Sequence, residues 1–398
     1  MASTAAISIV SAAPALWDVV IVGGGPAGLA VAIVAAEQGL SVVVVERRDF
    51  PPDKACGEGV LPPGVKALAR LGIADRFDRS TSYPFAGIRF IQEDGAAAES
   101  RMPSSGVGIR RTVLVAALAE RAEELGAVLR NRCSVTGVKP TSSEAVVSTT
   151  DGEIFARLVV AADGLHSSLR KASGLEAPPS SRRRFALRQH YRIRPWTDFV
   201  EVYVDDKGEA VVTPVSDESV SINFVWEDGV IEHPKIDILA ARFPALLARL
   251  GSAPTISSIR GAGPMARAAT RRNGDRMVLV GDAAGFVDSI SGDGLSIAFN
   301  SALILGKHLP EILKRGSTRE SMQAYEREAR RVYRGYWLVT NGLLMVARHP
   351  RARRTIISSL MRHPGAFTAL MGGAMRMMVT AASPSASGSP SRAGRVRG

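Results

Sequence analysis

A glycine-rich run near the N-terminus has the spacing that phosphate binding requires. It consists of Gly23, Gly24, Gly25, Pro26, Ala27 and Gly28. It lies between an apolar run at 19–22, which predicts a buried strand, and a helical pattern at 29–38. In such a turn the first glycine allows a tight bend, the second lets a pyrophosphate approach the backbone, and the third lets the helix pack closely on the strand. The helix N-terminus then offers its N–H groups to the phosphates.

An acidic residue stands where the ribose of a bound dinucleotide would be recognised. Glu46 ends a second strand pattern, at 41–46, roughly 20 residues beyond the last glycine of the run. A carboxylate at this place can accept hydrogen bonds from both hydroxyls of the ribose. Three glycines alone could mark a simple turn, but the strand, the helix and the acid around them predict a bound dinucleotide. We assign Arg47, the next residue, to the same site.

Two later segments place an aspartate beside a glycine directly after a buried-strand pattern. The first follows the apolar run at 158–162 and the second follows the run at 277–280. The second is succeeded by two further glycines. These residues are Asp163 and Gly164 in the first segment, Gly281 and Asp282 in the second, and then Gly292 and Gly294.

Taken in this order, the three motifs resemble those of the FAD-dependent monooxygenase and geranylgeranyl-reductase-like flavoprotein superfamily, the fold group of p-hydroxybenzoate hydroxylase. In that family the aspartate at the position of Asp282 binds the ribityl chain of FAD. The pair at Asp163 and Gly164 lies near the cofactor and the proposed approach of the nicotinamide. The family also has an arginine where a helix opens, and Arg111 matches it by register. A solvated basic pair with Arg110 is the alternative.

The string at 54–59, Lys-Ala-Cys-Gly-Glu-Gly, is the most distinctive local segment. It resembles the Lys-x-Cys-Gly segment of many geranylgeranyl-reductase-like flavoproteins, which lies beside the isoalloxazine ring with the cysteine on the substrate side. The resemblance implies that Cys56 and Glu58 flank the reacting face as catalytic residues. The alternative for Cys56 is a small buried apolar side chain.

Some family features are altered or missing. Ser289 stands where the family usually has a proline that shapes the loop near the flavin. The tryptophans, at 17, 196, 226 and 337, include no Trp-x-Trp pair, which argues against a flavin-dependent halogenase. No second G-x-G-x-x-G follows a strand. We therefore expect NAD(P)H to act as an electron donor that is not tightly bound, without a separate domain of its own.

The elements that position these residues predict two interleaved domains. We expect an α/β fold in which a Rossmann-type FAD-binding domain is interleaved with a mainly antiparallel β substrate domain, followed by a helical C-terminal extension. Alternating residues at 199–204 and 219–226 indicate the antiparallel strands. The predicted parts are 17–180 (FAD-binding, with an inserted substrate-domain segment near 80–108), 181–265 (substrate domain), 266–310 (FAD-binding), 311–382 (helical region) and 383–398 (disordered basic tail).

Composition excludes several classes. Hydrophobic residues make up 46% and charged residues 22%, as in ordinary globular proteins, so wholesale disorder is excluded. The two cysteines lack the spacing of a zinc site and are too few for a disulfide framework. We find no charge-free apolar stretch of about 18 residues, so no membrane span is expected. No basic residue precedes Arg47, so a secretory signal is not expected and a cytoplasmic location is.

The positive charge is concentrated at the C-terminal end. The net charge is +12, and the segment 348–398 contains nine arginines and no acidic residue. Because the rest of the chain is nearly balanced, we do not expect nucleic acid as a partner. Three interpretations of the helical region remain open: ordinary helices that cover the core, a lid over an apolar ligand, or an interfacial helix pair in peripheral contact with anionic lipid.

The resemblance implies an FAD-dependent oxidoreductase. The favoured expectation is an NAD(P)H-dependent monooxygenase that hydroxylates an apolar aromatic or lipid-like substrate through a flavin C4a-hydroperoxide. The alternative is a geranylgeranyl-reductase-like ene reductase that saturates a prenyl chain. A third hypothesis is a non-catalytic nucleotide-binding protein that its basic region recruits to membranes or nucleic acid.

Overall fold

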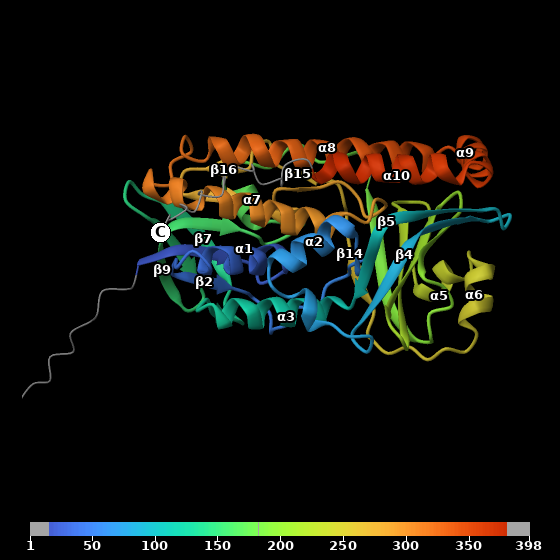
Figure 1. Ribbon diagram of the computed structural model, residues 1–398. Helices are drawn as coiled ribbons and strands as arrows, with labels where there is room; N and C mark the ends of the chain where they lie inside the picture. The colour runs from blue at the N-terminus through green and yellow to red at the C-terminus, as the bar shows by residue number, and fades with distance from the viewer. Residues whose placement is uncertain (1–15, 182, 380–398) are drawn as a thin grey trace, which may run out of the picture.

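The structure is a computed structural model that describes residues 16–181 and 183–379, so the basic tail predicted at 383–398 lies outside it. Two lobes lie side by side in Figure 1, and a layer of long helices runs along both. Each lobe contains a sheet of eight strands within the described ranges. This architecture confirms the predicted fold class: a Rossmann-type lobe interleaved with a mainly antiparallel one, and helices at the C-terminal end.

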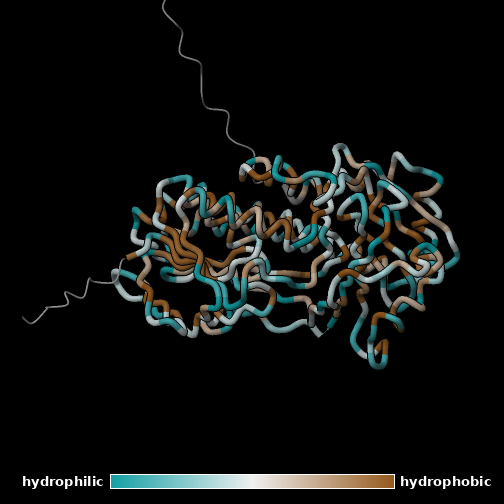
Figure 2. Tube along the Cα trace, turned by 90° about the horizontal axis from the view of Figure 1, so that it is seen from below, coloured by the Kyte–Doolittle hydropathy of each residue, from teal (hydrophilic) through white to brown (hydrophobic). Residues whose placement is uncertain are grey.

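The first sheet has a parallel centre. In spatial order its parallel strands are β17 (Met277–Leu279), β9 (Gly152–Ala161), β1 (Leu16–Val22), β2 (Val42–Val45) and β6 (Val128–Arg130). The antiparallel strands β8 (Ala145–Thr149) and β7 (Val135–Pro140) extend it beyond β9, and β16 (Asn273–Gly274) pairs with β17. Most of the central strand residues are buried on both faces, which explains their unbroken apolar runs. Figure 2 shows the hydrophobic strands gathered inside this lobe.

Parallel order brings three distant loops together. β1, β9 and β17 are neighbours that run in the same direction, so their carboxyl ends lie at one edge of the sheet. Each of the three sequence motifs begins just after one of these ends. Ligands of open α/β sheets bind at this edge, and the topology alone therefore places the three motifs around a common site.

Helices cover this sheet. They are α1 (Pro26–Ala36), α2 (Pro62–Arg70), α3 (Arg111–Glu124), α4 (Ser168–Ala172) and α7 (Gly294–Lys314), with short 3-10 turns at Ala74–Arg76 and Gly281–Ala283. Helix α1 begins at Pro26, earlier than the pattern at 29–38 predicted, because proline fits the first turn of a helix, where its missing N–H is not needed. Every residue of α1 is buried, and the helix packs against α3 and α7.

The second sheet is antiparallel except for one parallel pair, β11 with β4. Its order is β14 (Arg260–Ala262), β10 (Arg184–Arg192), β13 (Ser219–Glu227), β12 (Gly208–Ser216), β11 (Phe199–Val204), β4 (Ser82–Gln92), β5 (Ala97–Ile109) and β3 (Gly59–Val60). Two short helices, α5 (Ile236–Ala240) and α6 (Pro244–Leu250), pack on one face. A small pair, β15 (Arg267–Ala268) with β18 (Gly285–Phe286), leads the chain back to the first lobe.

Three helices form the layer that covers both lobes: α8 (Gln323–Ala347), α9 (Pro350–Arg362) and α10 (Pro364–Val379). Helix α8 packs against α7 and α10, whereas α9 and α10 pack against β5 of the second sheet. Within the described ranges, no helix combines the length and the apolar character needed to cross a membrane. We refer to α8, α9 and α10 together as the helical layer.

Candidate functional site: a cavity shared by both lobes

A cavity of about 1390 Å³ runs from the edge of the first sheet, across the second sheet, to the helical layer. Typical small-molecule pockets measure about 300–1,000 Å³, so this cavity can hold more than one ligand. The three sequence motifs line one end, which we call the nucleotide end. Strands of the second sheet and the helical layer line the other, which we call the substrate end.

The structure explains the glycines of the first motif in different ways. Gly23 has a φ of +111°, and a Cβ there would lie 2.5 Å from the carbonyl oxygen of Ala162. A Cβ on Gly28 would lie 2.0 Å from the Gly23 carbonyl oxygen. A Cβ on Gly25 would meet only Nη2 of Arg111, at 3.4 Å. The fold therefore tolerates a side chain at Gly25, and the open space in front of this backbone fits the close approach of a pyrophosphate.

The carboxylate of Glu46 is held in a fixed orientation at the nucleotide end. Its Oε2 accepts the backbone N–H of Gly24 at 2.9 Å, and its Oε1 accepts that of Arg48 at 3.0 Å. Glu46 is buried and lines the cavity beside Arg47. Each carboxylate oxygen has a further lone pair, so Glu46 can also accept hydrogen bonds from ribose hydroxyls.

The second motif is organised by local hydrogen bonds. The Asp163 carboxylate accepts the Ser167 hydroxyl at 2.5 Å and the Leu169 N–H at 3.2 Å, and so it supports the start of α4, where Ser167 is the N-cap. Its neighbour Gly164 has a φ of +85° and lines the cavity. These bonds assign Asp163 a part in shaping the loop, while its predicted place near the nicotinamide stays a prediction.

A buried arginine joins the second motif to the third. Arg170 has no exposed surface; it donates to the carbonyl oxygen of Leu165 at 2.9 Å and to that of Ala283 at 3.0 Å. The first acceptor lies just after Asp163, the second just after Asp282. No local sequence pattern reveals this clamp, because one of its acceptors is a backbone atom of a loop more than a hundred residues away.

Positive charge surrounds the aspartate of the third motif. Burial raises the pKa of the Asp282 carboxyl, while the charges of Arg111, Lys54 and Arg170 oppose that shift. Burial also lowers the pKa of Lys54, and the nearby charge of Arg111 lowers it further. Arg111, which opens α3, thus lies near both Gly25 and Asp282. A basic group beside an open glycine turn suits an anionic cofactor.

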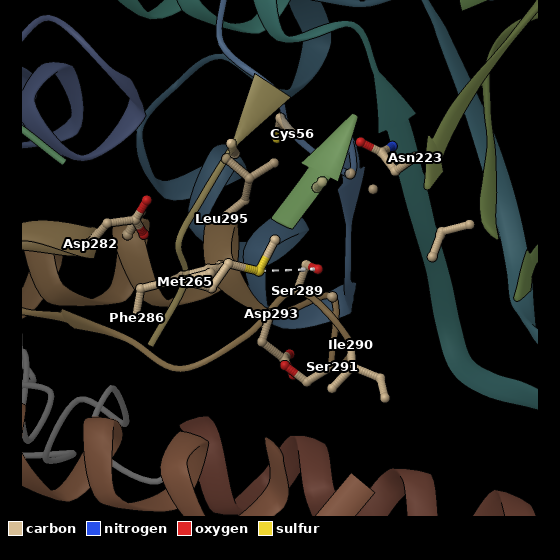
Figure 3. Close-up of a pocket in the computed structure, with 18 of the residues that line it drawn as sticks. Cys56, Asn223, Met265, Asp282, Phe286, Ser289, Ile290, Ser291, Asp293 and Leu295 are labelled. Atoms are coloured by element: carbon tan, nitrogen blue, oxygen red, sulfur yellow. Dashed lines mark hydrogen bonds between the residues drawn. The ribbon is translucent and has the colours of Figure 1, made fainter. Parts of the chain in front are cut away.

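The loop at 281–294 closes over the same space. Gly281 has a φ of +56°, and a Cβ there would lie 2.6 Å from Cβ of Ala27, so the third motif touches the first. Gly292 and Gly294 bracket Asp293, whose Oδ1 has no hydrogen-bond partner among the described residues. Burial raises the pKa of Asp293 to about 7. In Figure 3 this loop lies between the cavity and the helices at the bottom of the view.

Tyrosines of α8 fix this loop and the strand before it. Tyr325 donates to the Leu279 carbonyl at 2.7 Å, and Tyr333 donates to the Gly281 carbonyl at 2.8 Å. The Tyr336 hydroxyl donates to the Asp288 carbonyl at 2.9 Å and accepts the N–H groups of residues 287 and 288. The loop with Ser289 in place of the family's proline is therefore held by side chains of the helical layer.

Cys56 lies at the boundary between the two ends of the cavity. Its sulfur accepts the N–H of Glu58 at 3.4 Å, and the Gly57 carbonyl accepts the Thr213 hydroxyl of β12 at 2.9 Å. Burial raises the pKa of the Cys56 thiol, so the group is neutral near pH 7. Figure 3 places Cys56 near Asn223, with Asp282 on the other side of the cavity.

Glu58 is a buried hub. It is 1% exposed, has a φ of +59°, and accepts the N–H of Arg111 at 2.9 Å through Oε1. Its Oε2 lies 2.6 Å from Nε2 of His190 on β10. Because both oxygens are engaged, the geometry makes Glu58 a positioning residue for the loop that carries Cys56. Its part in the chemistry stays a prediction.

The partners of Glu58 come from the second sheet. Nη1 of Arg188 lies 2.7 Å from Nδ1 of His190. Since a guanidinium only donates, Nδ1 accepts, and the proton on Nε2 is donated to Glu58. Arg188 also pairs with Asp53, which accepts Nε of Arg260 at 2.9 Å. No sequence motif marks His190, because nothing local shows that this strand meets the loop at 53–58.

The substrate end is apolar on both sides. On β11, alternating residues point to opposite faces of the sheet, and Val200, Val202 and Val204 line the cavity. Phe367 and Met375 of α10 line it from the helical layer. The opening between these walls suits a long hydrocarbon chain.

Polar groups of the second sheet also reach the cavity wall, among them Glu209 and Thr213 of β12 and Asn223 of β13. Asn223 on β13 is 5% exposed and lines the cavity, and its Nδ2 has no partner among the described residues. No sequence motif marked this asparagine, which sits in an ordinary alternating strand pattern. Buried polar groups in proteins are nearly always hydrogen-bonded, so Asn223, like Oε1 of Glu209 and Oδ1 of Asp293 in the same cavity wall, is a candidate contact for a ligand.

Comparison with known proteins decides the family. A family described as "FAD binding domain" matches residues 17–337. The chain belongs to this family. FAD is therefore its cofactor, and this flavoprotein is an FAD-dependent oxidoreductase, as the resemblance in the motifs implied. The hypothesis of a non-catalytic nucleotide-binding protein is not supported.

Curated relatives of this flavoprotein include reductases and a monooxygenase. Digeranylgeranylglycerophospholipid reductase 2 of Methanosphaera stadtmanae is 26% identical, with 75% of this chain and 79% of the relative covered. Menaquinone reductase of Mycolicibacterium smegmatis is 28% identical, covering 84% and 85%. Rifampicin monooxygenase of Streptomyces venezuelae is 26% identical, covering 73% and 63%.

Solved structures share the fold of this flavoprotein. A flavoprotein/dehydrogenase from Cytophaga hutchinsonii has a TM-score of 0.75 at 22% identity, covering 92% of this chain and 97% of that one. Halogenase PltM in complex with phloroglucinol and FAD has a TM-score of 0.71 at 16% identity, covering 92% and 95%. At these identities the likeness establishes the fold alone, so the expectation against halogenation, based on the missing Trp-x-Trp pair, stays a prediction.

Proposed function

We propose that this flavoprotein is an NAD(P)H-dependent monooxygenase that hydroxylates a phenol-like head group attached to a long apolar chain. The observation that carries the proposal is the unpartnered Nδ2 of Asn223 in the cavity wall. Leaving a buried donor without a partner costs about 1–3 kcal/mol. A substrate oxygen that accepts this hydrogen bond explains the position of the amide, whereas a pure hydrocarbon offers no acceptor.

The apolar substrate end supports the long chain. Val200, Val202 and Val204 face side chains of α10 across the cavity. Burying each methylene group contributes about 0.8 kcal/mol. A chain of many methylenes therefore supplies binding energy that holds the head group next to the flavin, where the reaction takes place.

The nucleotide end fits FAD. Gly25 and Arg111 would hold the pyrophosphate, Glu46 the adenosine ribose, and Asp282 the ribityl chain, around a turn shaped by Gly23. When bound, FAD would pass two electrons from NAD(P)H to O2 and deliver one oxygen atom to the substrate. In the balanced reaction a C–H bond becomes C–OH, while NAD(P)H, O2 and one proton become NAD(P)+ and water.

The chain's own residues would position the substrate and handle its proton. Asn223 donates to the substrate oxygen, and the neutral Cys56 thiol forms part of the wall beside the reacting ring. Asp293, with a pKa raised to about 7 by burial, can exchange a proton with a substrate hydroxyl near neutral pH. The helical layer and the second sheet exclude water from this space.

The test uses the full-length, FAD-loaded protein with NADPH or NADH and a long-chain alkylphenol. We expect the substrate to stimulate oxygen uptake, and isotope-labelled O2 to place one labelled atom in the organic product. The same phenol without its chain should bind at least tenfold more weakly, because it leaves the apolar end unfilled. Label recovered only in hydrogen peroxide and water would contradict hydroxylation.

Saturation of a double bond in a prenyl chain is a second candidate. Two relatives carry reductase names, digeranylgeranylglycerophospholipid reductase and menaquinone reductase, and the apolar end suits a prenyl chain equally well. This reaction adds a hydride and a proton across C=C and consumes no O2. Anaerobic incubation with NADPH and a prenyl lipid would give a product heavier by two hydrogen atoms, which would replace the first candidate.

A further inference from the structure

The outer surface of the helical layer gathers exposed apolar side chains. Of the twelve large hydrophobic residues that are exposed in the described part of the chain, seven lie on these three helices. They are Trp337, Leu338, Met345, Ile356, Met361, Leu370 and Met377. Large exposed apolar patches with polar rims mark protein or membrane contacts, so we expect this surface to contact a protein or a membrane.

The same surface is strongly basic. Residues 323–379 contain ten arginines, of which eight are exposed, and two acidic residues, both glutamates near the start of α8. The other two arginines, Arg348 and Arg353, pair with Glu227 and Asp206 of the second sheet's lobe. Along α8, Arg327, Arg331 and Arg334 are exposed at four- and three-residue spacing, and Leu338 continues the same stripe. The outward face of α8 therefore changes from basic to apolar along its length, while its inward face holds the tyrosines that fix the flavin loop.

The cavity opens within this surface. Leu338 and Met345 of α8, Ile356 of α9, and Leu370 and Met377 of α10 are all exposed, and all line the cavity. Side chains that are exposed and also line the cavity mark the place where the cavity opens. The substrate end therefore reaches the outside between the helices of the layer, at the exposed apolar patch, whereas the nucleotide end opens elsewhere, near Arg47 and Arg48.

We propose that the helical layer is a docking surface for an anionic lipid bilayer, and that the substrate passes from the bilayer into the cavity without crossing water. The chemistry of the surface selects this occupant, because arginines attract anionic headgroups while apolar side chains enter the acyl boundary. Membrane docking goes beyond the proposed function. The lipid-like nature of the substrate that enters the cavity rests on the proposed function.

Vesicle flotation of the full-length FAD-loaded protein tests docking. We expect it to bind vesicles of phosphatidylcholine mixed with phosphatidylglycerol, with at least tenfold weaker binding to phosphatidylcholine alone and clear weakening at high salt. Reversing the three charges of the stripe, Arg327→Glu, Arg331→Glu and Arg334→Glu, should reduce binding at least tenfold. The control reverses three exposed charges outside the layer, at Arg130, Lys139 and Lys171. Equal loss in both triple variants would overturn the proposal.

Trp337 gives a direct readout of the contact. It is 55% exposed, whereas the tryptophans at 17, 196 and 226 are buried or half-buried, and it does not line the cavity. Bromine on the lipid acyl chains should quench its fluorescence in bound protein. Trp337→Phe, which keeps an aromatic side chain, should lose the quenching while still floating with the vesicles. Binding without quenching would confine the contact to charges and contradict the apolar part of the proposal.

Two measurements separate this inference from its rivals. A protein that is dimeric in solution with Trp337 shielded, and that ignores vesicles, would assign the surface to a second copy and overturn the proposal. Activity on substrate dispersed in a neutral detergent should be equal in wild-type protein and the α8 charge variant, while activity on substrate in anionic vesicles falls at least tenfold in the variant. Absence of hydroxylation with intact vesicle binding would instead remove only the proposed function.

Discussion

The Nε2 atom of His190 lies 2.6 Å from Oε2 of Glu58, and this buried hydrogen bond ties the second sheet to the loop that carries Cys56. The wall between nucleotide end and substrate end is therefore built by both lobes. The stability of this wall depends on His190, whose Nδ1 already accepts a hydrogen bond from Arg188. The relative position of flavin and substrate thus depends on a polar contact between lobes.

Replacing Glu58 by glutamine should destabilise this wall. Glu58 accepts from both His190 and the Arg111 N–H, so in either orientation the NH2 of a Gln amide would face one of these donors. The His190 tautomer cannot switch, because Nδ1 accepts from Arg188. We expect the free energy of unfolding to fall by about 1–3 kcal/mol, measured by urea denaturation, together with faster loss of FAD. Glu153→Gln, at an exposed position on β9, should be neutral. If the Glu58→Gln variant kept the stability and the FAD release rate of the wild type, Glu58 would not be the hub of this wall.

Gly25→Ala should separate cofactor binding from folding. Its Cβ meets only the end of the Arg111 side chain at 3.4 Å, but it would occupy the space in front of the turn. We expect at least a tenfold loss of FAD affinity, followed by flavin fluorescence, with apoprotein stability unchanged within about 0.5 kcal/mol.

Two other glycines act as controls for this experiment. Gly137→Ala has open space around its Cβ and should leave both FAD affinity and stability intact. Gly28→Ala would collide with the Gly23 carbonyl oxygen and should damage the fold itself. If Gly25→Ala retained full FAD affinity, the pyrophosphate would have to bind elsewhere.

Asn223→Leu should have opposite effects on stability and on substrate binding. Removing an unpartnered buried amide relieves a desolvation cost, so the free energy of unfolding of the substrate-free protein should rise, by about 1 kcal/mol. Removing the donor should weaken alkylphenol binding roughly tenfold, followed by perturbation of the flavin spectrum. Asn131→Leu, at an exposed position, provides the control. Equal alkylphenol affinity in wild type and Asn223→Leu would show that this amide does not bind the substrate.

Asp293 should make stability depend on pH. Its pKa rises from 3.8 to about 7 on folding, so the folded state keeps a proton that the unfolded chain releases. The free energy of unfolding therefore falls as pH rises between these two values, by at most about 4 kcal/mol. Asp293→Asn does not titrate. In apoprotein the variant should be more stable than wild type at about pH 8, and this advantage should vanish near pH 4. A constant difference across this range would contradict the shift.

Tyr336→Phe should loosen the loop at 281–294. The change leaves the N–H groups of residues 287 and 288 without their acceptor, which costs about 1–3 kcal/mol each if water does not replace it. We expect lower stability and faster FAD release, measured by stopped-flow fluorescence. Tyr191→Phe removes a single hydroxyl contact to Gln189 and should have a smaller effect. Similar release rates in both variants would exclude Tyr336 as the residue that restrains the loop.

The nucleotide end was largely predictable because its signals are local. Each glycine or aspartate motif follows an apolar run, and parallel strands bring their carboxyl ends to one edge. The same runs and alternating strands predicted the interleaved fold class. The helix containing Arg111 was found by its register, and the structure places this guanidinium beside Gly25.

The wall of the substrate end was not predictable in the same way. Glu58 was singled out, but His190 and Arg188 approach it from a strand more than a hundred residues away, through a pairing of lobes that no local pattern specifies. Asn223 looks like any polar residue in an alternating strand until its missing partner is seen. The hydroxyl contacts of Tyr336 depend on how α8 packs, which its spacing alone does not reveal.

Helix α8 carries Tyr336 on its buried side and Trp337 on its exposed side, one residue apart. Each residue of an α-helix turns by about 100°, so inserting a single residue upstream of this pair would move Tyr336 into the exposed position of Trp337, whereas deleting one would move the indole of Trp337 into the buried position of Tyr336. Surface loops can change in length without moving these two side chains, but α8 keeps Tyr336 buried in only one rotational register. Changes in its length should be accepted only in steps close to whole turns.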